Sequence, residues 1–217
     1  QQAQVTSGEV SASSFSGNLT ISYEDSSGET STATVRSTVA ADDTLSTSGN
    51  ESSAIAKSEA INDLSGITGV TASINATTLN GGAIGGGTLD ASNYLTINDQ
   101  QITSFAVNPN DASGALIDAI NAESETTGVI ASLDENSQLV LTAEDGRNIE
   151  VEVSSATVTA ITGLSAGIER GSITLQSADQ FDLGGGSDLT AANLTAGVYG
   201  VNSENAVSSI DVTTVEG

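Results

Sequence analysis

The sequence predicts an α+β fold, mostly β, with two related sub-modules, each a small antiparallel sheet with one short packed helix. The first observation behind this is composition: the chain has 23 glycines, one proline and six aromatic residues, which suits many short strands and turns. The second is an internal repeat, because residues 56–74 align with residues 115–133 at an offset of 59 positions. A short helix cannot bury an apolar face alone, so each repeat must pack its helix on a sheet.

The first predicted element pair is a β-hairpin near the start of the chain. Residues 18–24, NLTISYE, alternate apolar and polar side chains, as a half-buried strand does. Residues 32–40, TATVRSTVA, are expected to pair with them across the turn at residues 25–29.

A polar loop and the first repeat follow this hairpin. Residues 41–53 are predicted to be a loop whose last residues, Ser52 and Ser53, cap the next helix. That helix is expected to end near Gly66, and residues 69–79 are predicted to form a strand.

Residues 80–90, NGGAIGGGTLD, form the most glycine-rich stretch of the chain. No Lys-Ser or Lys-Thr pair follows the glycines, so this stretch is not a phosphate-binding loop. It predicts a flexible linker or tight turns, and it is the expected boundary between the modules.

The second repeat is predicted to begin with two strands across a short polar turn, in residues 93–107. Asn110 or Asp111 is expected to cap the helix that follows. The apolar face of that helix comprises Leu116, Ile117 and Ile120.

Residues 128–153 predict a three-stranded meander. The turns are expected at residues 134–137 and at Asp145-Gly146, because Asp-Gly is a strong hairpin signal. In the last strand the side chains expected to share one face are Ile149, Val151 and Val153.

The repeat predicts a nested organisation of two outer modules. The first is expected to be discontinuous, built from residues 1–88 plus 167–205, and the second, residues 89–166, is inserted into it. A simple tandem of two modules is the alternative.

Composition excludes several functional classes. The formal net charge is -24, with no Cys and no His, so disulfides, thiolate nucleophiles and histidine metal ligands are absent. The charge argues against binding to nucleic acid and to anionic membranes. The sequence contains no run of about 18 apolar residues, so no membrane-spanning helix is predicted. The first residues lack the pattern of a signal peptide. The missing initiator Met indicates a fragment or a processed chain.

None of the Asp and Glu clusters in the sequence forms a recognisable catalytic or metal-binding motif. We therefore predict that the protein is not an enzyme and has no catalytic residue, no cofactor and no metal. Residues 134–138 and 183–189 are weak calcium candidates, and turns explain both better. The acidic pairs Glu123 with Glu125 and Glu150 with Glu152 lack the pocket that catalytic carboxylates need, so solvated faces are expected.

Several motifs resemble bacterial flagellins. The stretch YLTINDQQITSFAV, then LIDAIN, TGVIAS and LVLTAEDGRNIEV, resembles the flagellin inner repeat, which also occurs in flagellar cap and other filament-associated proteins. RGSITLQSADQFDL at residues 170–183 is similar to a strand that follows in flagellins. Residues 206–217 resemble the approach to the C-terminal polymerisation helix. The resemblance covers roughly residues 52–217.

The resemblance implies the central, surface-exposed region of a filament subunit, located outside the cell on the bacterial flagellum. It implies a homo-oligomer formed through flanking helices absent from this chain, and contacts between neighbouring outer domains are open. The alternatives are a flagellar cap or hook-associated protein, and a repeat domain of a secreted adhesin. The family often carries O-linked sugars, and the candidate acceptors in the polar loop are Ser46, Thr47 and Ser48.

Overall fold

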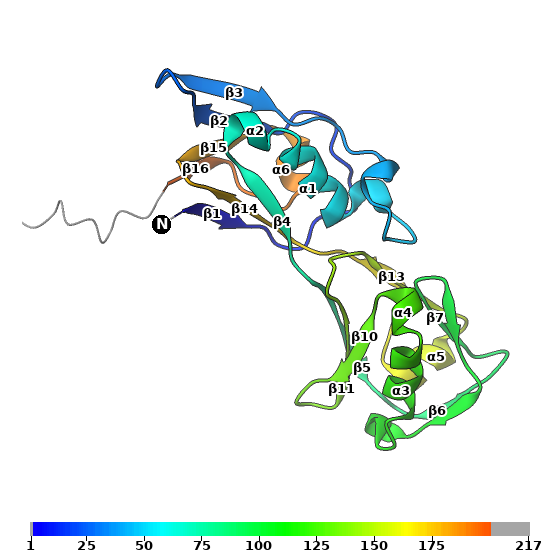
Figure 1. Cartoon of the computed structure of the whole chain (residues 1–217). Coiled ribbons are helices and arrows are strands. Elements are labelled where there is room, and N and C mark those ends of the chain that lie inside the picture. Colours follow the sequence, from blue (N-terminus) through cyan, green and yellow to red (C-terminus); the bar gives the residue numbers. More distant parts are fainter. Residues whose placement is uncertain (1, 201–217) are drawn as a thin grey trace, which may run out of the picture.

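The computed structural model describes residues 2–200, and the predictions for residues 201–205 and 206–217 lie outside them. The predicted α+β, mostly β fold is confirmed. Its apolar side chains form two separate clusters, one from residues 3–72 and 173–194 and the other from residues 84–164. Figure 1 shows these as two bodies, the first blue, cyan and orange and the second green and yellow, joined by two crossing segments.

The first body contains two antiparallel sheets. The three-stranded sheet has the order β1 (Ala3–Thr6), β14 (Ile173–Ser177), β4 (Thr71–Ile74). The four-stranded sheet has the order β16 (Gly197–Tyr199), β15 (Phe181–Gly184), β2 (Thr20–Glu24), β3 (Thr30–Thr34). The pairing of β2 with β3 confirms the predicted hairpin, but the strand predicted at residues 32–40 is wrong in its bounds, because β3 ends at Thr34 and Ala40 begins η1.

Short helices cover these sheets. They are α1 (Ala54–Asn62), α2 (Ser65–Thr68) and α6 (Ser187–Ala191), with the 3-10 turns η1 (Ala40–Asp42) and η2 (Asn50–Ser52). Ser53 caps α1, since its hydroxyl accepts a hydrogen bond from the N–H of Ala56 at 3.0 Å. Ser52 does not cap the helix, because it closes η2.

The second body has three small sheets and three α-helices. The first sheet has the order β10 (Ile130–Leu133), β11 (Gln138–Ala143), β5 (Thr77–Ala83). The second has the order β13 (Gly167–Glu169), β12 (Ile149–Val153), β7 (Leu95–Ile97), β8 (Gln100–Ile102). The third pairs β6 (Gly87–Leu89) with β9 (Phe105–Val107). Its helices are η3 (Pro109–Asp111), α3 (Ala115–Ala122), α4 (Ser124–Thr127) and α5 (Ala156–Thr162).

The repeat seen in the sequence is also a repeat of hydrogen bonds. Asn62 at the end of α1 donates to the carbonyl of Ala72 in β4 at 2.9 Å and accepts from its N–H at 2.7 Å. Asn121 makes the same two bonds to Ala131 in β10, at 3.1 and 2.7 Å. One asparagine in each unit therefore fixes the helix against its strand.

The turn between helix and strand is repeated as well. The hydroxyl of Thr68 donates to the carbonyl of Leu64, and Gly69 has φ 69°. Thr127 donates to Glu123 in the same way, and Gly128 has φ 70°. Glycine ends the helix at both places because its left-handed backbone is strained for other residues.

Of the two alternatives predicted for residues 80–90, the flexible linker is wrong, while the tight turn fits Gly86, which has φ 79° between β5 and β6. Gly81 and Gly82 belong to β5, which pairs with β11, and Gly87 begins β6. A Cβ on Gly81 would lie 2.9 Å from the carbonyl oxygen of Leu139. The glycines therefore permit a close approach between backbones rather than flexibility.

The prediction of a three-stranded meander at residues 128–153 is also wrong for its third strand. β10 and β11 form a hairpin, but β12 pairs with β7 and β13 instead of β11. The Asp145-Gly146 turn carries the chain from one sheet to another. The predicted facing of the strand is correct, since Ile149 and Val151 are buried.

Smaller corrections concern element ends. Gly66 lies inside α2, and the helical segment ends at Gly69. The strand predicted at residues 69–79 is two strands, β4 and β5, and residues 93–107 form three strands instead of two. Asp111 caps α3 from η3, accepting from the N–H groups of Leu116 and Ile117 at 3.1 and 3.0 Å, while Gly114 is the N-cap residue.

The packing of the strands near residues 80 and 168 suggests different boundaries for the inserted module. β5 and Ile84 pack in the second body, and so does β13 through β12. We propose that the inserted module runs from about residue 76 to residue 170, instead of residues 89–166.

Candidate functional site

The joint between the two bodies contains the residues that sequence reasoning singled out in the polar loop. Residues 43–50, here called the strap, link η1 to η2. The buried carboxylate of Asp43 accepts from the N–H of Leu45 at 2.8 Å, and from the N–H and hydroxyl of Ser46 at 3.0 and 2.6 Å. The side chain of Asn50 donates to the carbonyls of Asp43 and Ser46 at 2.9 and 2.7 Å. The strap is thus held by its own side chains.

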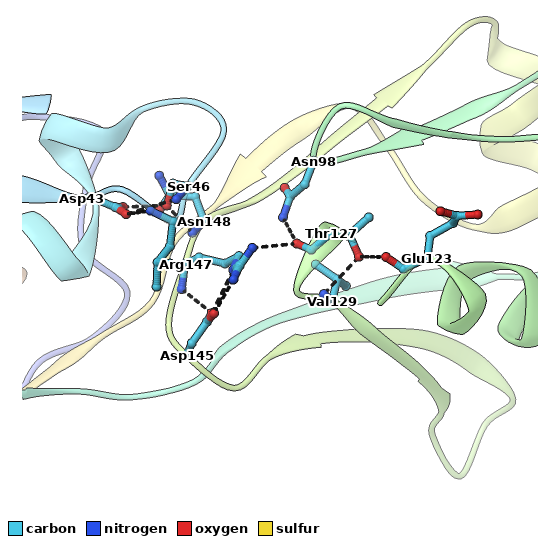
Figure 2. Close-up of polar contacts among 10 residues, drawn as sticks. Asp43, Ser46, Asn98, Glu123, Thr127, Val129, Asp145, Arg147 and Asn148 are labelled. Atoms are coloured by element: carbon cyan, nitrogen blue, oxygen red, sulfur yellow. Dashed lines mark hydrogen bonds and ion pairs between the residues drawn. The ribbon is translucent and has the colours of Figure 1, made fainter. Parts of the chain in front are cut away.

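The strap docks on Asn148 of the second body. The N–H of Asn148 donates to the hydroxyl of Ser46 at 2.9 Å (Figure 2). The side-chain amide of Asn148 donates to the carbonyls of Ser48 and Gly49 at 2.9 and 3.2 Å. Asn148 is 1% exposed, so these bonds lie out of water. They tie residues about 100 positions apart in the sequence.

Polar contacts continue from Asn148 into the second repeat (Figure 2). Arg147 donates to the carboxylate of Asp145 at 2.6 Å and to the carbonyl of Thr127 at 3.3 Å. Asn98 donates to that same carbonyl at 2.8 Å, and its side-chain oxygen accepts from the N–H of Glu150 at 2.8 Å. The end of the second repeat is therefore connected to the joint.

Against the effect of burial, the pKa of Asp145 is lowered by its contacts with Arg147. Burial alone would raise the pKa of the carboxyl, but hydrogen bonds from the side chain and backbone of Arg147, with its charge, outweigh burial and lower the pKa. The carboxylate stays ionised and paired, which suits a structural ion pair and not a proton donor.

On the first body, a buried lysine lies next to η2, which follows the strap. Lys57 in α1 is 0% exposed, and its ammonium group donates to the carbonyls of Ser11 and Ser52 at 2.8 and 2.6 Å. Burial lowers the pKa of Lys57 to about 7; the charge of Arg170 adds to this, and the charge of Asp188 opposes it. Lys57 ties the N-terminal segment and η2 to α1.

The second crossing segment has a carboxyl pair. The pKa of Glu169 is raised by burial and by the neighbouring carboxyl of Glu9. Glu9 also accepts from the N–H of Arg170 at 3.3 Å, and the Arg170 side chain donates to the hydroxyl of Ser52 at 3.3 Å. These contacts hold the segment between β13 and β14 against the first body.

The three candidate sugar acceptors lie in the strap in different environments. Ser46 is 7% exposed and uses its hydroxyl in the bonds to Asp43 and Asn148. Ser48 is half-buried, and Thr47 is exposed with its hydroxyl 3.3 Å from the carboxylate of Glu150. Of the three, Thr47 therefore has the most accessible hydroxyl.

The weak calcium candidates use their oxygens within the chain. In the turn at 134–138, Asp134 accepts from the N–H groups of Asn136 and Gln138 at 2.8 and 2.7 Å, and the bond from Gln138 does most to lower its pKa. In residues 183–189, the carboxylate of Asp188 accepts hydrogen bonds from the backbone N–H groups of residues 16–18. Within residues 2–200, no group of three His, Cys, Asp or Glu side chains is placed to hold a metal, and none of the helices there is long and apolar enough to cross a bilayer.

Sequence reasoning missed Asn148, and it considered Asp188 only as part of the weak calcium candidate at residues 183–189. Asn148 follows an Asp-Gly turn and looked like part of that turn, while Asp188 follows a glycine run. Their partners lie about 100 and 170 residues away, so no local pattern announces them.

Comparisons with known proteins identify the relatives of this chain. Residues 94–145 match the family described as the flagellin hook IN motif. Flagellin B of Helicobacter pylori is 43% identical over 102 residues, covering 46% of this chain and 19% of the relative. Flagellin A of Helicobacter felis is 38% identical over 121 residues, covering 52% of this chain and 23% of the relative. The chain thus spans about a fifth of the length of these relatives.

Among solved structures, the flagellar cap protein FliD from Helicobacter pylori aligns with 91% of this chain and 85% of its own, at 9% identity and a TM-score of 0.28. The sequence matches confirm the resemblance to the central region of a flagellin.

Proposed function

We propose that this chain is the surface-exposed outer region of a flagellar filament subunit, which sets filament surface properties in bacterial motility. The observation that carries the proposal is the match of residues 94–145 to the flagellin hook IN motif, together with 43% identity to a flagellin. Those matched residues fold within the second body, from β7 to the end of β11.

The secondary structure supports an outer position and not a polymerising one. The longest helix in residues 2–200 is α1, with nine residues, and the sequence has no sustained heptads. We propose that the subunit polymerises into a homo-oligomer through flanking helices that this chain lacks. Its place would then be extracellular, on the bacterial flagellum.

The charge gives the surface its character. A net charge of -24 on each copy would make the filament surface strongly anionic. Such a surface keeps neighbouring copies and filaments soluble and repels nucleic acid and anionic membranes. At about 0.15 M salt this repulsion extends roughly 8 Å from each charge.

We also propose that any O-linked sugar on the strap is attached to Thr47. Its exposure and the burial of Ser46 support this choice. Intact mass and peptide mapping of protein from the native source would locate the modification. A sugar mapped to Ser46 or Ser48 would contradict the choice of Thr47, and a protein whose mass equals that of its sequence would show that the strap carries no sugar.

The alternatives are a flagellar cap or hook-associated protein, and an adhesin repeat. The name of the matched motif includes the hook, so the matches leave the first alternative open. The identities to flagellins favour the filament.

Immunogold electron microscopy of intact cells tests the proposal, with antibody raised against this chain. Labelling along the full length of the filaments is the expected result. Labelling confined to tips or to the hook junction would support the cap or junction alternative, and labelling of the cell body with bare filaments would support the adhesin.

A further inference from the structure

The two repeats close the free edges of their own sheets. β4 is an edge strand, and the register with β14 directs the N–H and C=O groups of Val70 and Ala72 away from the sheet. The hydroxyl of Thr68 accepts from Val70 at 3.2 Å, and Asn62 bonds to both groups of Ala72. Side chains thus occupy backbone positions where another strand would bind.

The edge strand β10 is closed by the same residue types. The hydroxyl of Thr127 accepts from the N–H of Val129 at 3.1 Å, and Asn121 bonds to both groups of Ala131. Each repeat therefore brings its own edge protection.

By contrast, the edge strand β3 has no such cover. Its register with β2 directs the backbone groups of Ser31 and Ala33 toward β2, which leaves those of Thr30, Thr32 and Thr34 pointing outward. Within residues 2–200 no hydrogen bond reaches these outward groups. Figure 1 shows β3 at the outer side of the first body, beyond β2.

We infer that β3 is a docking edge for β3 of a second copy of this chain, in an antiparallel pair with Thr32 opposite Thr32. This inference rests on the proposed function, because a filament would hold many copies at high local concentration. In this register Thr30 faces Thr34 of the other copy, so outward groups meet outward groups along the whole strand.

The charges of the strand favour a second copy as the partner. Residues 30–34 carry no charge, although the chain has a net charge of -24, so the backbones can approach without facing carboxylates. The same register places Gly28 of one copy opposite Arg36 of the other, with Glu29 beside it. The Arg36 side chain is 39% exposed and already pairs with Asp42 and Asp63, so the uncharged strand itself, and not this arginine, is what favours the approach of a second copy.

A single-cysteine variant tests the register, because the native chain contains no cysteine. In the proposed pair the Cα atoms of residue 32 in the two copies would be about 5.5 Å apart, which a disulfide spans. Under mild oxidation Thr32→Cys should form covalent dimers at least about tenfold faster than Ser132→Cys, an exposed residue on the closed edge β10. Equal rates for the two variants would overturn the inference.

A charge variant tests the association without a covalent bond. Thr32→Lys places two cations opposite each other at the centre of the pair and should weaken self-association several-fold in sedimentation equilibrium at high protein concentration. Ser13→Lys, at an exposed position outside the sheet, is the charge-matched control and should leave association unchanged. Unchanged association in Thr32→Lys, with a retained melting temperature, would contradict the docking edge.

The same cysteine variants, placed in the full-length protein in cells, separate this inference from the proposed function. Filaments that contain the protein but give no Thr32→Cys dimers would overturn the docking edge and leave the filament assignment intact. Absence of the protein from filaments would overturn the assignment, and dimers of the isolated chain would still support the docking edge.

Discussion

Asp188 offers the sharpest prediction about stability. Its buried carboxylate accepts from the N–H groups of Ser16, Gly17 and Asn18, each at 2.9 Å, and from the hydroxyl of Ser16 at 2.9 Å. It fastens the segment before β2 to the first turn of α6. Asp188→Asn removes the charge and turns an amide donor toward backbone donors.

The expected loss follows from the bonds affected. Hydrogen bonds to a buried charge contribute about 1.5–3 kcal/mol each, and the amide oxygen of Asn retains some of them. We expect Asp188→Asn to lower the free energy of unfolding by about 3 kcal/mol. For a chain of this length that corresponds to a decrease in melting temperature of roughly 6–12 °C.

The effect should depend on pH. Burial raises the pKa of Asp188, but the hydrogen bonds from Asn18, Ser16 and Gly17 outweigh burial and lower the pKa below its usual range. A carboxyl whose pKa is lowered on folding stabilises the protein at every pH above its pKa in the unfolded chain, which is about 3.9 for Asp. This stabilisation is lost as the pH falls through the lower pKa of the folded protein. The difference between native protein and variant should therefore be constant from about pH 5 to 8 and shrink below about pH 4.

Thermal and urea unfolding followed by circular dichroism measure this difference. Asp182→Asn is the matched control, since it removes the same charge from a half-buried strand position in β15. Equal stabilities for the two variants, within about 0.5 kcal/mol, would refute the reasoning about Asp188.

The remaining predictions concern the joint, the repeat and a close backbone contact, and urea unfolding tests all of them. Asn148→Ala should cost about 2 kcal/mol and speed hydrogen exchange in the strap, because it removes two buried side-chain bonds. Asn121→Ala should cost about 2 kcal/mol by removing both bonds to its strand. Asn136→Ala, at an exposed hairpin tip, is the control for both, and a loss as large there would contradict these two predictions. Gly163→Ala should cost at least about 2 kcal/mol, since its φ is 76° and a Cβ would clash with the β5 backbone. Gly167→Ala, with open space around it, should cost less than about 1 kcal/mol, and equal losses for the two glycines would contradict the clash.

Local patterns in the sequence predicted the parts of the fold that depend on neighbouring residues. The alternation of residues 18–24 predicted β2 and its pairing with β3. Ser53 was recognised as a helix cap because its spacing to the next N–H is local. The repeat was visible because the same residues, Asn62 and Asn121, recur at the same offset and make the same bonds.

Long-range contacts explain the errors. The glycines at residues 80–90 resemble a linker in any local window, and only their contact with β11 and α5 makes them part of a sheet. Asp145-Gly146 signals a turn, but the strand that β12 will join is chosen by distant packing against β7. The strap looked like an open loop because its partner, Asn148, lies in the other body.

The most direct test of the account is the diameter of filaments that lack this region. Residues 2–200 would be deleted from the full-length subunit, and filaments would be examined by electron microscopy and helical reconstruction. If the region is an outer, surface-exposed part, filaments should still assemble, with a smaller diameter and an unchanged inner core. Loss of all filaments, or filaments of unchanged diameter, would contradict the central claim.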